Sequence, residues 1–317
     1  MLAPFPSLNL PDPPVIAGYC GRFAPSPTGE LHLGSLLAAV ASFLEARRHD
    51  GQWLVRMEDL DQPRMVAGAA DRILAVLDAH GFAWDEPVLY QSARSDVYEM
   101  ALAQLRERQL VYPCACTRRE VAQIARAGID GPVYPGTCRN GLQPGRTPRA
   151  WRLRVNGANV SFIDAIQGPQ SQQLADSVGD FVLHRADGLF AYQLAVVVDD
   201  AVQNINHVVR GADLLDSTPR QIYLLQSLGL TVPHYAHIPV LVNAAGEKLS
   251  KQTLAKPLQA TDAVSNLWQA LDYLGQKPPV DLAKTTLAEI WQWAHIHWCV
   301  EQVPGMRGVP IAGSRQA

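Results

Sequence analysis

The sequence is 317 residues long and contains no apolar run approaching the roughly 20 residues that a membrane-spanning helix requires. Its start, MLAPFPSLNLPDPP, lacks both a basic segment and a continuous apolar core, which argues against a secretory signal peptide. We therefore expect a cytoplasmic protein whose residues 1–17 form a proline-punctuated tail.

An excess of basic charge is also missing, because 27 Lys and Arg residues stand against 30 Asp and Glu residues. The formal net charge of −3 gives no overall signature of nucleic-acid binding, although a local basic patch would be enough for it. The hydrophobic content of 48% is typical of a soluble globular chain with a sizeable core. The length fits two domains, or one domain with an insertion.

Cysteine is scarce, and three of the five cysteines lie between Cys114 and Cys138. This clustering favours a metal site over a disulfide framework. Cys114 and Cys116 would face the same side of a strand, so both thiolates could bind one ion. Zinc prefers four ligands and favours thiolates, which leaves one position open. Three reduced cysteines in a loose core remain the alternative.

Strand-like and helix-like segments alternate over the first part of the chain, which predicts an α/β fold with a doubly wound parallel sheet. Ser95 or Asp96 would cap the third helix. The predicted strands are 17–24 and 53–59, and the predicted helices are 31–50, 66–81 and 95–110.

The alternation breaks between about 111 and 149, where glycine, proline and cysteine gather and periodicity is weak. Short strands follow at 150–155, 160–165 and 180–188, and the α/β pattern resumes at 190–201. A strand at 205–211, a helix at 213–229 and a strand with a lysine-bearing loop at 237–252 come next. We therefore predict two halves of one catalytic domain, 18–110 and 191–256, an insertion at 111–190 and a small helical region at 257–317.

The stretch APSPTGELHLGS connects the first predicted strand to the first predicted helix. Pro25, Pro27 and Gly29 would shape this turn, and Gly34 would let a ligand approach the helix backbone. A helix N-terminus suits phosphate, and His32 could donate a hydrogen bond to it. The same residues also fit a plain connecting loop, with His32 solvated or capping the helix.

The stretch GEKLSKQ follows a predicted strand and carries Lys248 and Lys251. Both could reach phosphates as mobile charges and stabilise the charge that grows on phosphoryl oxygens and pyrophosphate. A solvated surface loop is the alternative.

Four stretches in this order, RFAPSPTGELHLGS, VRMEDLDQPR, HVVRGADLL and EKLSKQ, together resemble the class I aminoacyl-tRNA synthetases, and PSPTGELHLG resembles the glutamyl branch. The likeness covers about 18–252. It implies a Rossmann-type catalytic domain with a zinc-bearing insertion. It also implies that ATP, with Mg²⁺, activates glutamate to glutamyl-adenylate by positioning and charge stabilisation, without a catalytic nucleophile and without tRNA.

The resemblance implies a role for each matching residue. His32, Gly34 and Lys251 would meet ATP, and His32, Lys248 and Lys251 would act in catalysis. Ser35 replaces the second histidine of one signature, and Leu249 and Gln252 depart from the other, but both lysines are kept. The residues implied for glutamate are Arg22, Ala24, Ser26, Glu58, Tyr192 and Arg210.

These residue types suit glutamate, because arginines bind carboxylates and Glu58 can accept from the ammonium group. From the residues alone, Glu58 could equally be a strand-end acid and Arg210 a surface ion-pair partner.

The resemblance also implies a fourth zinc ligand, Tyr134, with Cys114, Cys116 and Cys138; Asp130 or water remains an alternative. We expect Cys20 and Cys299 to be buried apolar residues. His295 and His297 are expected to be structural, since on a helix only His295 and Cys299 would share a face.

Only 65 residues follow Gln252, which we expect to be too few for a large anticodon-reading domain. The short form resembles the glutamyl-Q tRNA(Asp) synthetases, a paralogue family, and implies transfer of glutamate to the queuosine base in the anticodon loop of tRNA(Asp). A truncated enzyme that charges a tRNA 3′ end and a non-catalytic paralogue that binds tRNA or amino acid are the alternatives. The candidate phosphate contacts are Arg118, Arg119, Arg139, Arg146, Arg149, Arg152 and Arg154.

Overall fold

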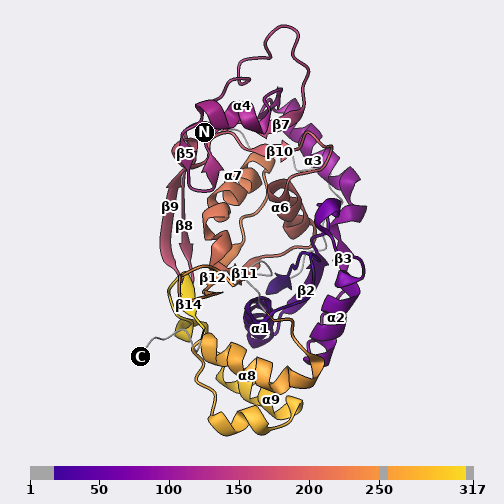
Figure 1. The fold of residues 1–317 in the computed structure, drawn as a ribbon, viewed down its shortest axis with the longest axis vertical. Helices are drawn as coiled ribbons and strands as arrows, with labels where there is room; N and C mark the ends of the chain where they lie inside the picture. The colour runs from indigo at the N-terminus through magenta and orange to yellow at the C-terminus, as the bar shows by residue number, and fades with distance from the viewer. Residues whose placement is uncertain (1–17, 250–255, 312–317) are drawn as a thin grey trace.

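The computed structural model describes residues 18–249 and 256–311. The predicted tail at 1–17 and the predicted phosphate ligand Lys251 lie outside these ranges. Figure 1 shows an elongated molecule, with most of the predicted insertion at one end, the C-terminal helices at the other and the central sheet between them. Among the described helices, none has the length and apolar character needed to cross a membrane.

The central sheet is doubly wound, as predicted, and its strand pairs in the described ranges are parallel except at the edge, where β9 pairs antiparallel with β8. On one side the strand order is β1-β2-β3, and on the other it is β11-β12-β8-β9. The amide of Asn206 donates to the carbonyl of Cys20 at 3.1 Å, which places β11 beside β1. The strands are β1 (Cys20–Phe23), β2 (Gln52–Met57), β3 (Leu89–Tyr90), β8 (Asn159–Asp164), β9 (Gly168–Gln173), β11 (His207–Gly211) and β12 (His234–Ile238).

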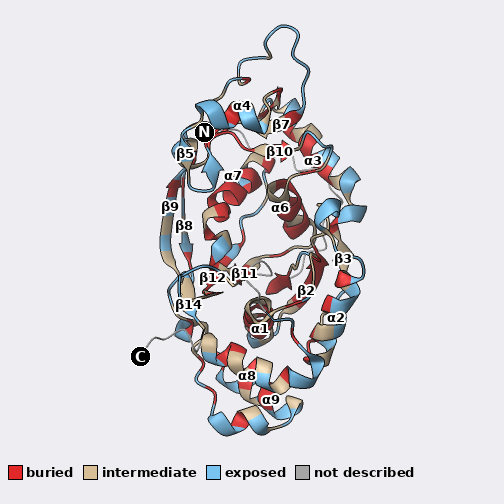
Figure 2. Ribbon diagram, viewed as in Figure 1, coloured by how far each residue is buried: buried red, intermediate tan, exposed pale blue. Residues whose placement is uncertain are grey.

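Helices cover both faces of this sheet, and Figure 2 shows that α6 and α7 are buried deeply, whereas α2 and α4 expose long outer faces. The predicted cap of α3 is wrong: Arg94 occupies the N-cap position, and its side chain makes no capping bond. The flanking helices are α1 (Leu33–Arg48), α2 (Ala69–Ala79), α3 (Ser95–Glu107), α6 (Tyr192–Val202) and α7 (Thr218–Leu228).

The predicted insertion contains a small antiparallel sheet of order β10-β7-β4. Helix α4 was not predicted; Thr117 and Glu120 begin it with reciprocal capping bonds. Strand β8 pairs with β12, so part of the predicted insertion extends the central sheet. The remaining elements here are β4 (Val111–Cys114), α4 (Arg118–Ile124), β5 (Ala127–Gly128), β6 (Gly131–Pro132), β7 (Ala150–Leu153), α5 (Leu174–Ser177) and β10 (Val182–His184).

The C-terminal region is mainly helical, as predicted, and its helices α8 (Ala263–Tyr273) and α9 (Leu287–His297) join the core around α1. An unpredicted strand, β14 (Gly308–Pro310), pairs in parallel with β13 (Val240–Val242). Because α9 ends at His297, Cys299 follows the helix, and the expected shared face of His295 and Cys299 does not exist. Cys299 is also only partly buried, unlike Cys20.

Candidate active site

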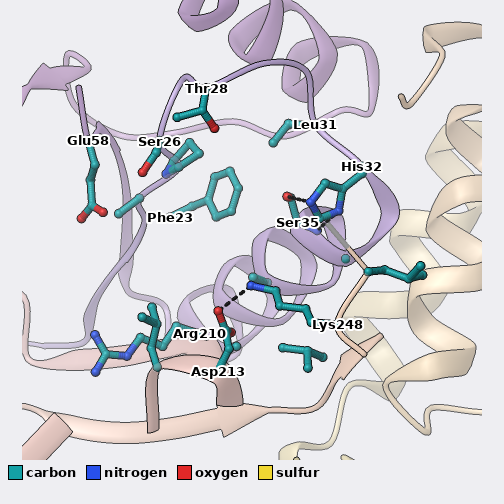
Figure 3. A pocket seen from close by; sticks show the side chains of 18 of the residues that line it. Phe23, Ser26, Thr28, Leu31, His32, Ser35, Glu58, Arg210, Asp213 and Lys248 are labelled. Atoms are coloured by element: carbon teal, nitrogen blue, oxygen red, sulfur yellow. Dashed lines mark hydrogen bonds and ion pairs between the residues drawn. The ribbon is translucent and has the colours of Figure 1, made fainter. Parts of the chain in front are cut away.

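A cavity of about 720 Å³ lies where the strand order reverses, beyond the carboxyl ends of β1 and β11. This is the place where doubly wound sheets bind their ligands. Figure 3 shows Glu58 and Arg210 at one end of the cavity, and His32, Ser35 and Lys248 at the other. We call these the acidic–basic end and the helix end.

At the helix end, His32 is the N-cap of α1, and its Nδ1 accepts from the amide of Ser35 at 3.2 Å. This is the capping role that the sequence left open. Because an accepting Nδ1 leaves the proton on Nε2, the imidazole is a donor at Nε2, where the hydroxyl of Ser35 lies 3.4 Å away. A Cβ on Gly34 would lie 3.1 Å from two atoms of the His32 ring, so glycine makes room for that ring.

Lys248 reaches the helix end from the segment after β13, and its Nζ lies 2.5 Å from Oδ2 of Asp213 (Figure 3). Both side chains are partly exposed, and both residues line the cavity. The structure therefore places Lys248 in the same cavity as the N-terminus of α1.

At the acidic–basic end, Asp200 lies between two buried arginines. It accepts from Arg22 Nε at 3.1 Å and from Arg56 Nη2 at 2.6 Å. Burial would raise the pKa of Asp200, but the two guanidinium groups lower it below its ordinary value. Asp200 thus stays ionised and fixes Arg22 in the cavity wall.

Glu58 follows β2 directly, and its amide donates to the carbonyl of Pro25 at 3.0 Å, which ties the two strand ends together. Only 9% of its side chain is exposed. Burial raises the pKa of Glu58 to about 7, although Arg56 and Arg22 act in the opposite direction. Burial, with Glu58 nearby, also raises the pKa of the Tyr192 hydroxyl, so this group is a neutral donor.

Arg210, at the end of β11, is 5% exposed and is held from two sides. Its Nε donates to His237 at 3.0 Å, and its Nη2 donates to Thr218 at 2.9 Å and to Gln221 at 2.7 Å. Its Nη1 is buried without a partner in the described ranges. A buried guanidinium nitrogen in this state suits a carboxylate ligand.

The cavity brings together every described residue that the sequence predicted for glutamate, ATP and catalysis. Contact with a ligand remains a prediction for each of them. The sequence did not point to three further residues, because their partners are far away in the sequence or belong to a different motif. These residues are Asp200, Asp213 and His237. The residues brought together are Arg22, Ala24, Ser26, His32, Gly34, Glu58, Tyr192, Arg210 and Lys248.

The predicted zinc ligands also come together. The thiol groups of Cys114, Cys116 and Cys138 all lie within 4.8 Å of one another. The hydroxyl of Tyr134 lies 3.4 Å from Cys114 Sγ and 3.5 Å from Cys116 Sγ. Sulfur atoms around a tetrahedral zinc are about 3.8 Å apart, given Zn–S bonds of about 2.3 Å. The 3.6 Å between the sulfurs of Cys116 and Cys138 fits this spacing.

Two details of the zinc prediction need correction. Strand β4 ends at Cys114, so Cys116 reaches the cluster from the following turn and not from the same strand face. Asp130 lies outside the cluster: its carboxylate pairs with Arg220 at 2.6 Å, and among the described residues the group of possible ligand atoms holds the three cysteines and no acid. Arg152 lies over the Tyr134 ring and donates to Cys114 Sγ at 3.3 Å, which would offset the negative charge of bound thiolates.

The seven candidate tRNA-contacting arginines fall into two groups. Arg139 and Arg146 form ion pairs with Asp180 and Glu120, while Arg152 and Arg154 lie over tyrosine rings. Those four have structural partners within the chain. The other three, Arg118, Arg119 and Arg149, are exposed, as is Arg146 within its ion pair.

The sequence matches the model of the family "tRNA synthetases class I (E and Q), catalytic domain" over residues 20–273. The chain belongs to this family. It is 60% identical to a glutamyl-Q tRNA(Asp) synthetase of Dechloromonas aromatica, over 90% of this chain and 96% of that protein. A second glutamyl-Q tRNA(Asp) synthetase, from Aromatoleum aromaticum, is 57% identical over 90% of both chains.

The fold agrees with the family. The glutamate-tRNA synthetase of Elizabethkingia anophelis superposes with a TM-score of 0.78 at 23% identity, over 94% of this chain and 68% of that chain. The protein is therefore an aminoacyl-tRNA synthetase-like ligase with a class I catalytic domain. The cavity at the strand reversal is the place in this class I fold where an active site is expected.

Proposed function

We propose that this class I ligase uses ATP to activate glutamate to glutamyl-adenylate without tRNA, and then transfers glutamate to the queuosine base in the anticodon loop of tRNA(Asp). The observation that carries this proposal is the 57–60% identity, over nearly the whole chain, to relatives named glutamyl-Q tRNA(Asp) synthetase. The catalytic-domain family supports the use of ATP.

The charges at the acidic–basic end support glutamate as the amino acid. Arg22 and Arg210 are buried cations that line this end of the cavity. Either guanidinium group could pair with the side-chain carboxylate that distinguishes glutamate from glutamine. Arg210 Nη1 would bind a carboxylate, and Glu58 would accept from the ammonium group.

The helix end supports the nucleotide role. His32 and the N-terminus of α1 provide hydrogen-bond donors for phosphate, and Lys248 provides a positive charge. Magnesium would accompany ATP. Zinc would be held by the three cysteines, with Tyr134 as the fourth ligand, at a distance from the adenylation chemistry, and would stabilise the insertion.

The decisive experiment uses tRNA(Asp) that contains or lacks queuosine, each with and without its 3′-terminal adenosine. We expect the enzyme to transfer labelled glutamate only to the queuosine-containing forms, whether or not the 3′ adenosine is present. Labelling that requires the 3′ adenosine, and not queuosine, would replace the proposal with charging of a tRNA 3′ end. Pyrophosphate exchange with ATP and glutamate alone tests activation, and a non-catalytic binding protein would give no signal.

A further inference from the structure

Behind Arg210 lies a buried polar chain that does not line the cavity. The side chains of Asp164 and His237 are fully buried. The Nδ1 of His237 lies 2.5 Å from Oδ2 of Asp164, and its Nε2 lies 3.0 Å from the Nε of Arg210. The three side chains come from β8, β12 and β11, so the central sheet itself holds them in line.

The hydrogen bonds fix the protonation state of this chain. Asp164 accepts from His237 Nδ1 and, through Oδ1, from the amides of Ile166, Gln167 and His237 at 2.9–3.0 Å. Arginine Nε can only donate, so His237 Nε2 must be the acceptor and Nδ1 must carry the proton. Burial also lowers the pKa of His237 to about 4, which agrees with a neutral imidazole.

The result is a guanidinium group with one orientation. His237 holds Nε, while Thr218 and Gln221 hold Nη2, and Nη1 is left without a partner in the described ranges. A free arginine side chain would lose much rotamer entropy when it binds a carboxylate. Here the protein has already fixed the side chain before a ligand arrives.

We propose that His237, oriented by Asp164, is a positioning residue that sets Arg210 to receive a carboxylate of glutamate through Nη1. This inference rests on the proposed role of Arg210 in glutamate binding. His237 itself touches no substrate. Its loss should weaken glutamate binding and leave ATP binding unchanged, because the helix end lies on the far side of the cavity.

The test measures pyrophosphate exchange for His237→Leu, which removes the acceptor, and His237→Gln, whose amide oxygen can replace it. We expect the KM for glutamate to rise about 10- to 100-fold in His237→Leu, as for a misplaced binding group. The KM for ATP and the rate at saturating glutamate should stay within about threefold of wild type, and His237→Gln should recover most of the loss. His234→Leu, at the exposed start of the same strand, is the matched control.

A KM for glutamate within about twofold of wild type in a folded His237→Leu protein would overturn the inference while the proposed function stood. Thermal melting identifies a variant that does not fold. In that case Asp164→Asn carries the test. Its amide oxygen would stay with the three backbone amides that bond Oδ1, which turns the NH₂ group, a donor, toward Nδ1 and favours the proton on Nε2. The same rise in KM is expected, and an unchanged KM would overturn the inference.

A second measurement does not depend on glutamate. The Nε–H resonance of Arg210 should be protected from solvent exchange in the wild type and lose this protection in His237→Leu. An unprotected resonance in the wild type would overturn the positioning role, even if the enzyme failed to activate glutamate. If the resonance is protected but the enzyme shows no glutamate-dependent pyrophosphate exchange, the result contradicts the proposed function and leaves the positioning role standing.

Discussion

Lys248 Nζ lies 2.5 Å from Oδ2 of Asp213 at the helix end of the cavity. The ion pair is partly exposed, so its contribution is small, about 0.2–1 kcal/mol. A triphosphate, with its much greater charge, would readily take Lys248 from Asp213. The ion pair therefore keeps Lys248 near the helix end and costs little to break when the lysine binds a phosphate.

We predict that Lys248→Ala slows glutamate-dependent pyrophosphate exchange by about 100- to 1,000-fold, because it removes a preorganised positive charge from the reacting phosphates. Lys251→Ala is predicted from the sequence to have an effect of the same size. Asp213→Asn should change the rate by less than about fivefold, as expected for an exposed ion pair. Lys284→Ala, an exposed lysine in the C-terminal region, is the control. An unchanged rate in Lys248→Ala would remove this residue from the mechanism.

Glutamate binding should depend on pH through Glu58, whose pKa burial raises to about 7. Only the ionised carboxylate can pair with the ammonium group of the amino acid. As the pH falls from about 8 to about 6, the ionised fraction falls about tenfold, so the KM for glutamate should rise by about the same factor. His237, with its pKa near 4, stays neutral over this range and does not contribute.

The control for this pH profile is Glu58→Gln, measured over the same pH range. Its KM for glutamate should be higher than that of the wild type at the alkaline end and should vary little with pH. If the variant kept the full pH dependence of the wild type, a different group would be titrating.

Much of the fold could be predicted from the sequence, because most of its strands and helices have clear periodicity. Helix α4 escaped prediction since it has only seven residues, of which Val121 alone is buried. Strand β14 escaped because it is three residues long and includes Pro310. Short elements of this kind depend on tertiary partners and not on a local pattern.

The site residues that lie in recognisable motifs could be predicted from the sequence. Those that hold another side chain in place from a distant part of the chain could not. Arg22 and Arg210 belong to recognisable stretches, but Asp200, which holds Arg22, is 178 residues away from it. Its only local signal is a pair of acids, Asp199 and Asp200, at the end of an apolar run. A buried acid after such a run is a reason to look for an arginine partner.

Asp200 should therefore be important for stability. Asp200→Asn leaves Arg22 and Arg56 as buried charges without their shared carboxylate, so we predict a loss of about 3–5 kcal/mol in the free energy of unfolding, measured by urea denaturation. Asp187→Asn, which removes an exposed partner of Arg185, should cost less than about 1 kcal/mol. Equal losses of unfolding free energy in both variants would show that Asp200 does not stabilise the two buried arginines as proposed.

Zinc binding can be tested by metal analysis of the purified protein. We predict about one zinc per chain in the wild type and in Cys299→Ser, since Cys299 is outside the cluster. Cys138→Ala should lose most of the metal, and its melting temperature should fall. Tyr134→Phe keeps all three thiolates, so it should retain zinc but release it to a chelator more readily. Full occupancy in Cys138→Ala would rule out the proposed ligand set.

The exposed arginines of the insertion separate tRNA binding from activation. The triple variant of Arg118, Arg119 and Arg149 to glutamate should raise the KM for tRNA by about tenfold or more, because interactions with phosphate dominate affinity for RNA. The dependence of tRNA binding on salt should also weaken, by about one unit of the logarithmic slope for each arginine that no longer binds a phosphate.

Two controls separate this effect from a general loss of activity. Pyrophosphate exchange without tRNA should stay within about twofold of wild type, since none of these three arginines lines the cavity. Lys277→Glu with Lys284→Glu, in the segment between α8 and α9, controls for most of the added negative charge, since it changes the net charge by about four units where the triple variant changes it by about six. In Figure 1, α8 and α9 lie at the end opposite α4. If the control impaired transfer as strongly as the triple variant, the C-terminal end would be the tRNA-binding end instead.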